Sequence, residues 1–220
     1  MTATINRPST IDRFFGVVVE PDSYRNIAYL LLGLPLGTVW FAALVTGVSV
    51  AASMLVVALI GIPALLGMWY VTRAFANVER GLANVLLHEN LSYAPVESRH
   101  HGNVWVRLRA MSRDRARWRE IGYLLLRLPA GVATFTAATV ALSTPLWLIW
   151  APFHARIVDD TPFGSWFGAS ELEDITTSPW ATLLVPLGMV LLVAAFHVLN
   201  ALAQACGRWT TSALTMEDER

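Results

Sequence analysis

The chain reads RNIAYLLLGLPLG at residues 25–37 and REIGYLLLRLPAG at residues 119–131. Nine of the thirteen aligned positions are identical, and the second copy begins 94 positions after the first. Each copy opens a long apolar stretch of the kind that crosses a lipid bilayer. The sequence therefore predicts an all-α integral membrane protein that contains a duplicated unit.

The composition supports lipid as the solvent of most of the chain. Charged residues make up 15% of the sequence and hydrophobic residues 55%, whereas soluble domains carry about 25% charged residues. The single cysteine, Cys206, excludes an intramolecular disulfide.

The apolar stretches predict four membrane spans. Residues 27–72 carry no charge, and one helix of that length would be about 70 Å long, twice what a bilayer needs. We therefore expect two antiparallel spans with a turn near residues 46–49, where a glycine and small polar residues interrupt the run. The third span can extend through or kink at Pro145. The four spans are expected at about 24–45, 51–70, 120–142 and 179–205.

The polar segments flank these spans. Apolar residues at 3.6-residue spacing predict that the second span continues as an amphipathic helix; they are Val71, Phe75, Val78, Leu82, Val85 and Leu86. A loop is expected over 91–103 and another helix over 104–118. The predicted organisation is an N-terminal segment (1–23), a transmembrane domain (24–209) and a disordered tail (210–220).

The distribution of arginine predicts the orientation. Segment 73–119 holds nine arginines, and segment 151–178 holds one, Arg156. Because basic loops stay in the cytoplasm, we expect a multi-pass cell-membrane protein whose 73–119 segment and both termini are cytoplasmic and whose 151–178 segment lies outside. Both copies then enter from the inside. This predicts a parallel repeat of two hairpins, related by a pseudo-twofold axis along the membrane normal.

The duplicated motif, an aromatic residue and arginine followed by Tyr-Leu-Leu-Leu-x-Leu-Pro-x-Gly, resembles the Putative sensor membrane domain. The resemblance covers residues 24–208. That family occurs in haloarchaea and actinobacteria, often ahead of a histidine kinase or a DNA-binding module. The resemblance implies a signal-input module without a defined ligand. No output domain follows in this sequence, so we expect such a sensor to act through a separate partner.

The outer segment 151–178 is the candidate ligand site. It is acidic and aromatic, and carboxylates with aromatic rings can bind a divalent or organic cation. The alternative is a solvated cap whose aromatic residues anchor at the headgroups. The candidate ligand-binding residues are Asp159, Asp160, Trp166, Glu171, Glu173 and Asp174.

An arginine-rich helix before the third span is the candidate contact surface. Basic clusters beside a membrane attract anionic lipid, and the same surface can dock a cytoplasmic protein. No nucleic-acid-binding fold fits this segment. The residues are Trp105, Arg107, Arg109, Arg113, Arg115, Arg117, Trp118 and Arg119.

Three polar residues within the spans are further candidates. Arg127 stands where the first copy has Gly33, and we expect it to snorkel to the inner surface. His197 can titrate near neutral pH or bond a carbonyl group. Asn200 is expected to donate a hydrogen bond between helices. Gly33 with Gly37 could allow close helix approach, but Arg127 replaces the first glycine in the second copy, and the preferred interpretation is a pair of matched kinks at Pro35 and Pro129.

The chain offers no signature of an enzyme, and no metal site or cofactor is expected. His100 and His101 are adjacent in a polar loop and make a poor preformed metal site. The preferred hypothesis is a sensor-like input module in the lipid bilayer with a protein partner and possible homo-oligomerisation. The alternative is a non-catalytic accessory subunit of a transporter or other membrane complex. A small-solute carrier would need more polar residues in the first two spans.

Overall fold

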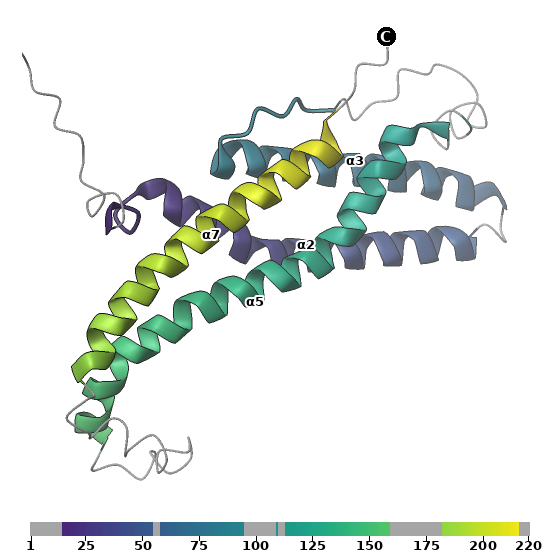
Figure 1. The fold of residues 1–220 in the computed structure, drawn as a ribbon. Helices are drawn as coiled ribbons and strands as arrows, with labels where there is room; N and C mark the ends of the chain where they lie inside the picture. Colours follow the sequence, from purple (N-terminus) through teal and green to yellow (C-terminus); the bar gives the residue numbers. More distant parts are fainter. Residues whose placement is uncertain (1–14, 55–57, 95–108, 110–112, 159–181, 216–220) are drawn as a thin grey trace, which may run out of the picture. The chain divides into compact units, whose positions relative to one another are not determined.

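The computed structural model describes residues 15–54, 58–94, 109, 113–158 and 182–215. No strand occurs in these residues, which agrees with the predicted all-α class. They form four long helices, α2 (Pro21–Met54), α3 (Ala58–Leu87), α5 (Arg115–Val158) and α7 (Leu184–Leu214) (Figure 1).

Three of these helices are long and apolar enough to cross a membrane. They are α2 over its full length, α5 over Arg115–Phe153, and α7 over its full length. At 34 residues, α2 is about 50 Å long, which exceeds the roughly 30 Å of bilayer hydrocarbon. The helices indicate a multi-pass membrane protein.

The predicted turn at residues 46–49 is wrong, because α2 continues through it. Gly47 serves close packing instead, since Met68 of α3 covers the position that its side chain would fill. The Ser53 hydroxyl donates to the Ser49 carbonyl at 2.8 Å, as small polar residues commonly do inside helices. The turn to α3 therefore lies later, between Met54 and Ala58.

The other three helices also differ in length from their predictions. α3 runs on to Leu87, which confirms the predicted helical continuation of the second span. α5 passes through Pro145 and extends to Val158. α7 includes residues 210–214, which were predicted to be a disordered tail. Those residues are ordered because Thr210 and Leu214 are buried.

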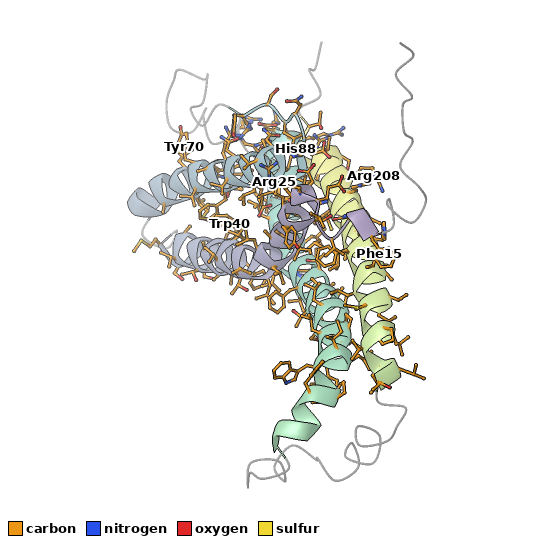
Figure 2. The ribbon with its side chains drawn as sticks, turned by 90° about the vertical axis from the view of Figure 1, so that its left-hand side faces the viewer. Phe15, Arg25, Trp40, Tyr70, His88 and Arg208 are labelled. Atoms are coloured by element: carbon orange, nitrogen blue, oxygen red, sulfur yellow. The ribbon has the colours of Figure 1, made fainter. Side chains whose placement is uncertain are left out.

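The chain divides into two compact units, one of residues 1–23 with 137–201 and one of residues 24–136 with 202–220. In the second unit, α2 and α3 form an antiparallel hairpin. Trp40 of α2, labelled in Figure 2, packs on Phe75 of α3 with ring centroids 4.2 Å apart. Nearer the start of α2, Arg25 Nη1 lies 3.1 Å from His88 Nε2.

The two copies of the repeated motif cross each other through their glycines. A side chain at Gly131 would overlap the carbonyl of Gly33, and one at Gly37 would lie 2.8 Å from the Arg127 carbonyl oxygen. From the first pair to the second, the residue number rises from 33 to 37 in α2 and falls from 131 to 127 in α5. The two helices therefore run in opposite directions where they cross. This differs from the predicted parallel repeat, which would keep a constant numerical difference between contacting residues.

In the first unit, α5 and α7 pack antiparallel. A side chain at Gly188 would lie 2.7 Å from Ile149 Cγ1 and 2.9 Å from the Pro145 carbonyl oxygen. Asn200 Nδ2 donates to Ser23 Oγ at 2.8 Å and joins α7 to α2.

Candidate functional site

The second unit is built around a buried carboxylate, Glu79 of α3. Its side chain is fully buried. It accepts hydrogen bonds from Trp40 Nε1 at 2.8 Å and from the Tyr123 hydroxyl at 3.2 Å. Arg127 Nε completes the set as an ion pair at 3.1 Å. Because three donors satisfy the carboxylate, its burial is tolerated.

Arg127 does not snorkel, which corrects the expectation from the sequence. Its side chain is 1% exposed. The guanidinium carbon lies 5.0 Å from the centre of the Tyr29 ring, within cation–π range. A side chain on Gly33 would come within 3.5 Å of Arg127 Nη1. The arginine of the second copy therefore lies close beside the glycine at the matching position of the first.

The matching tyrosines of the two copies meet at one hydroxyl group. Tyr29 and Tyr123 each place their phenol oxygen 3.0 Å from Thr210 Oγ1 of α7. A threonine hydroxyl has one proton to donate and lone pairs to accept. It can therefore serve both phenols at once only if at least one of them donates to it. We call Trp40, Glu79, Tyr29, Tyr123, Arg127 and Thr210 the Glu79 cluster.

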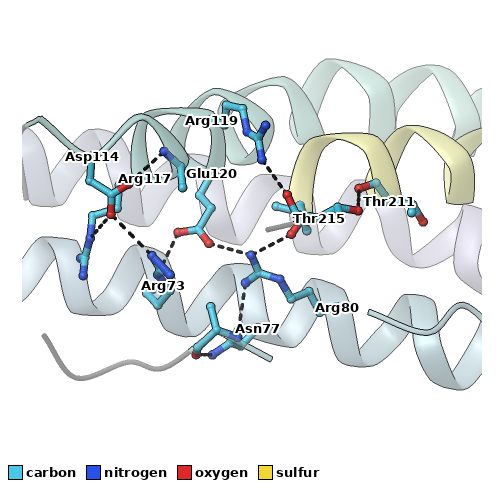
Figure 3. A network of polar contacts seen from close by, with 12 residues as sticks. Arg73, Asn77, Arg80, Asp114, Arg117, Arg119, Glu120, Thr211 and Thr215 are labelled. Atoms are coloured by element: carbon cyan, nitrogen blue, oxygen red, sulfur yellow. Dashed lines mark hydrogen bonds and ion pairs between the residues drawn. The ribbon is translucent and has the colours of Figure 1, made fainter. Parts of the chain in front are cut away.

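A second buried carboxylate, Glu120 of α5, holds two arginines of α3 (Figure 3). Glu120 Oε2 lies 3.1 Å from Arg73 Nε, and Glu120 Oε1 lies 2.7 Å from Arg80 Nη2. Arg80 Nη1 also donates to Asn77 Oδ1 at 2.9 Å. Asp114 adds a weaker ion pair with Arg73 at 3.9 Å. We call Arg73, Asn77, Arg80, Asp114 and Glu120 the Glu120 cluster.

Two arginines bind the last carbonyl groups of α7 and of the residue that follows it. Arg80 Nη2 donates to the Leu214 carbonyl at 3.1 Å, and Arg119 Nη2 donates to the Thr215 carbonyl at 2.6 Å. The final carbonyls of a helix lack partners within it, and cations there also favour the helix dipole. The end of α7 is thus held directly by the arginine that pairs with Glu120.

Two asparagines of α3 hold the chain that follows the helix. Asn84 bonds both the amide and the carbonyl of Leu91 at 2.8 and 2.9 Å. Asn77 does the same for Ala94 at 2.9 and 2.7 Å. Seven residues of helix and three steps of extended chain both span about 10 Å. The spacing of the asparagines therefore matches an extended segment running back along α3.

The dipeptide His88–Glu89 ends α3 and ties it to α7. His88 has a φ of 56°, a left-handed conformation that glycine usually supplies at this position. The Glu89 amide donates to the Ala83 carbonyl at 3.3 Å, which closes the helix end. Glu89 Oε2 then accepts from the Thr211 hydroxyl at 3.1 Å.

The described residues include only part of the predicted contact surface. Arg109, Arg113, Arg115, Trp118 and Arg119 are exposed. Arg117 is buried instead, which corrects its placement on that surface. It pairs with Asp114 at 3.2 Å and lies 5.9 Å from the centre of the Trp69 ring. Trp105 and Arg107 fall outside the described residues.

The other predicted candidates are scattered. His197 is exposed, and Asn200 donates a hydrogen bond to Ser23 of α2. The proposed ligand residues of the outer segment lie outside the described residues; they are Asp159, Asp160, Trp166, Glu171, Glu173 and Asp174.

Glu79 and Glu120, the two residues that organise this unit, were not among the candidates predicted from the sequence. Both glutamates stand in helices next to apolar residues. A carboxylate in such a position indicates a buried ion pair, because a charge that is buried needs a partner. Nothing in the sequence identifies which arginine supplies that partner.

Comparison with known proteins identifies a family for this chain. A family model described as Putative sensor matches residues 29–214, which is most of the chain. The matched range includes both buried carboxylates and the end of α7. No curated protein and no solved structure matches the chain.

Proposed function

The chain belongs to the Putative sensor family, and on that premise we propose that it is a membrane-embedded signal-input module acting through a separate cytoplasmic or membrane partner. The proposal includes no catalytic step. It keeps the predicted cytoplasmic placement of the arginine-rich residues 107–119.

One observation supports this role above the others. The Glu120 cluster connects α3, α5 and the end of α7 through Arg80, which contacts both Glu120 and the Leu214 carbonyl. Any shift of α3 against α5 must therefore change what holds the end of α7. A sensor needs two such arrangements with different affinities for its partner.

The chemistry of this cluster suits a change between two arrangements. Arg80 has three acceptors within reach, on Glu120, Asn77 and Leu214. Hydrogen bonds that involve a charged group contribute about 1.5–3 kcal/mol each. Exchange of one acceptor for another can thus shift the balance between two packings without unfolding the unit.

In this proposal the acidic segment 151–178 remains the receiver of the stimulus. Helix α5 supports this route, because it carries Glu120 near its start and continues to Val158, within this segment.

The test is affinity capture of the tagged protein from native membranes in mild detergent, followed by mass spectrometry. The wild-type chain is compared with Glu120→Gln, and Gly122→Ala on the same helix is the control. A stoichiometric kinase or transcription regulator, reduced by Glu120→Gln and retained by Gly122→Ala, would support the proposal. Co-purified transporter subunits would favour an accessory subunit instead, and no partner at all would refute action through a separate protein.

A further inference from the structure

Helix α3 carries its charges on the inside. Its three charged residues are buried, with Arg73 5%, Glu79 0% and Arg80 1% exposed. Among residues 64–87, every exposed residue is apolar; these are Gly67, Val71, Ala74, Val78 and Val85. A helix on the surface of a soluble protein shows the opposite pattern, with charges outward and apolar residues inward.

The packing of α3 against α2 sets its depth. Trp40 lies near the middle of α2, which is a candidate membrane span. Its indole contacts both Phe75 and Glu79 of α3. Gly47, further along α2, packs against Met68. Because α3 lies alongside α2 over this length, residues 68–79 of α3 lie beside a candidate membrane span.

We infer that the outer face of α3, formed by Gly67, Val71, Ala74, Val78 and Val85, contacts the acyl chains of the lipid bilayer. The Glu79–Arg127 ion pair then lies at the depth of the hydrocarbon. This replaces the cytoplasmic assignment of residues 73–87 made from the sequence. The inference does not depend on the proposed signalling role.

Three physical requirements for such a helix are met. A helix satisfies its own backbone hydrogen bonds, as the hydrocarbon demands. The exposed face offers no charge or hydrogen-bonding side chain to the lipid. Glu79 and Arg127 have opposite charges and bond each other inside the unit, so the charge that enters the bilayer has a partner.

The experiment is site-directed spin labelling of the full chain in liposomes. Single cysteines are introduced at Val71, Val78 and Val85 in a Cys206→Ala background, and collision with oxygen is compared with collision with a water-soluble nickel chelate. Val39→Cys on the exposed side of α2 is the lipid reference. Asn90→Cys, at an exposed position after the end of α3, is the reference for the aqueous boundary.

We expect the labels at Val71, Val78 and Val85 to match Val39→Cys, with high oxygen and low nickel accessibility. High nickel accessibility, as at Asn90→Cys, would overturn the inference by showing water at this face. Low accessibility to both reagents would also overturn it, because a second copy or another protein would then cover the face. Three sites keep the test valid if one variant fails to fold.

Discussion

The two buried carboxylates hold their arginines in different ways. Glu79 pairs with one arginine, and its other donors are Trp40 and Tyr123. Glu120 pairs with two arginines, Arg73 and Arg80. The first group balances one arginine against one carboxylate and is surrounded by aromatic rings, whereas the second balances Arg73 and Arg80 against Glu120 and the more distant Asp114.

This difference predicts different responses to damage. Arg127 has no second carboxylate, and its Nη2 finds no hydrogen-bond partner within the described part of the chain. Arg80 has Asn77 and the Leu214 carbonyl as further acceptors. We therefore expect the Glu79 cluster to stay in one arrangement, and the Glu120 cluster to be able to exchange hydrogen-bond partners.

The largest effect is expected from Glu79→Gln. The substitution keeps the shape but leaves Arg127 as a buried unpaired charge, which costs about 3–5 kcal/mol. Unfolding by SDS titration in micelles measures the loss. The double variant Glu79→Gln, Arg127→Met should regain much of it, because the stranded charge is then gone. If Glu79→Gln were as stable as wild type, the Glu79–Arg127 ion pair would not be what holds this cluster in one arrangement.

Glu120→Gln should cost less, about 1.5–3 kcal/mol, because both arginines keep other partners. The effect should be local. Amide hydrogen exchange is expected to rise at residues 211–214, where Arg80 holds the end of α7, and to stay unchanged at residues 123–131. Equal increases in both regions would show that the two clusters are one cooperative unit and would remove the distinction between them.

Gly131→Ala sharpens the comparison by disturbing the Glu79 cluster alone. The added methyl would overlap the Gly33 carbonyl, and such overpacking costs about 1–3 kcal/mol. Gly122→Ala on the same helix is the matched control, since nothing lies within 4 Å of the position of its added methyl. That control should be neutral or slightly stabilising, because alanine favours helices over glycine. Thermal unfolding in detergent compares the pair.

The smallest effect is expected from Thr210→Val, which removes the hydroxyl between Tyr29 and Tyr123 at nearly constant volume. The loss of these neutral hydrogen bonds should lower stability by about 1 kcal/mol. Serine at this position restores the hydroxyl and should recover the bonds. A Thr210→Val loss as large as that of Glu79→Gln would mean that the hydroxyl, rather than the ion pair, organises the cluster.

The sequence was sufficient for the helical class and for three long apolar helices that could cross a membrane, because long uncharged runs have few other solutions in a bilayer. It offered close approach at Gly33 and Gly37 only as the less favoured interpretation, beside matched kinks at Pro35 and Pro129. It misplaced the turn after α2, since Gly47 and Ser49 look like a turn in sequence but serve packing and backbone hydrogen bonding inside the helix.

The face of α3 could not be assigned from periodicity alone. A 3.6-residue pattern shows that Val71, Val78 and Val85 share a side of the helix, but not whether that side faces protein or its surroundings. In water the apolar side would turn inward. In this protein these valines are exposed, and the charged residues between them are buried. Periodicity also could not predict the burial of Glu79, because its partner Arg127 is 48 residues away in sequence.

That separation also has a consequence for biosynthesis. A ribosome adds about 5–20 residues per second, so the 48 residues between Glu79 and Arg127 take about 2–10 s to make. During that interval α3 has emerged and its counter-charge has not. The final placement of α3 must therefore wait for α5, and the ion pair imposes an order of assembly on the chain.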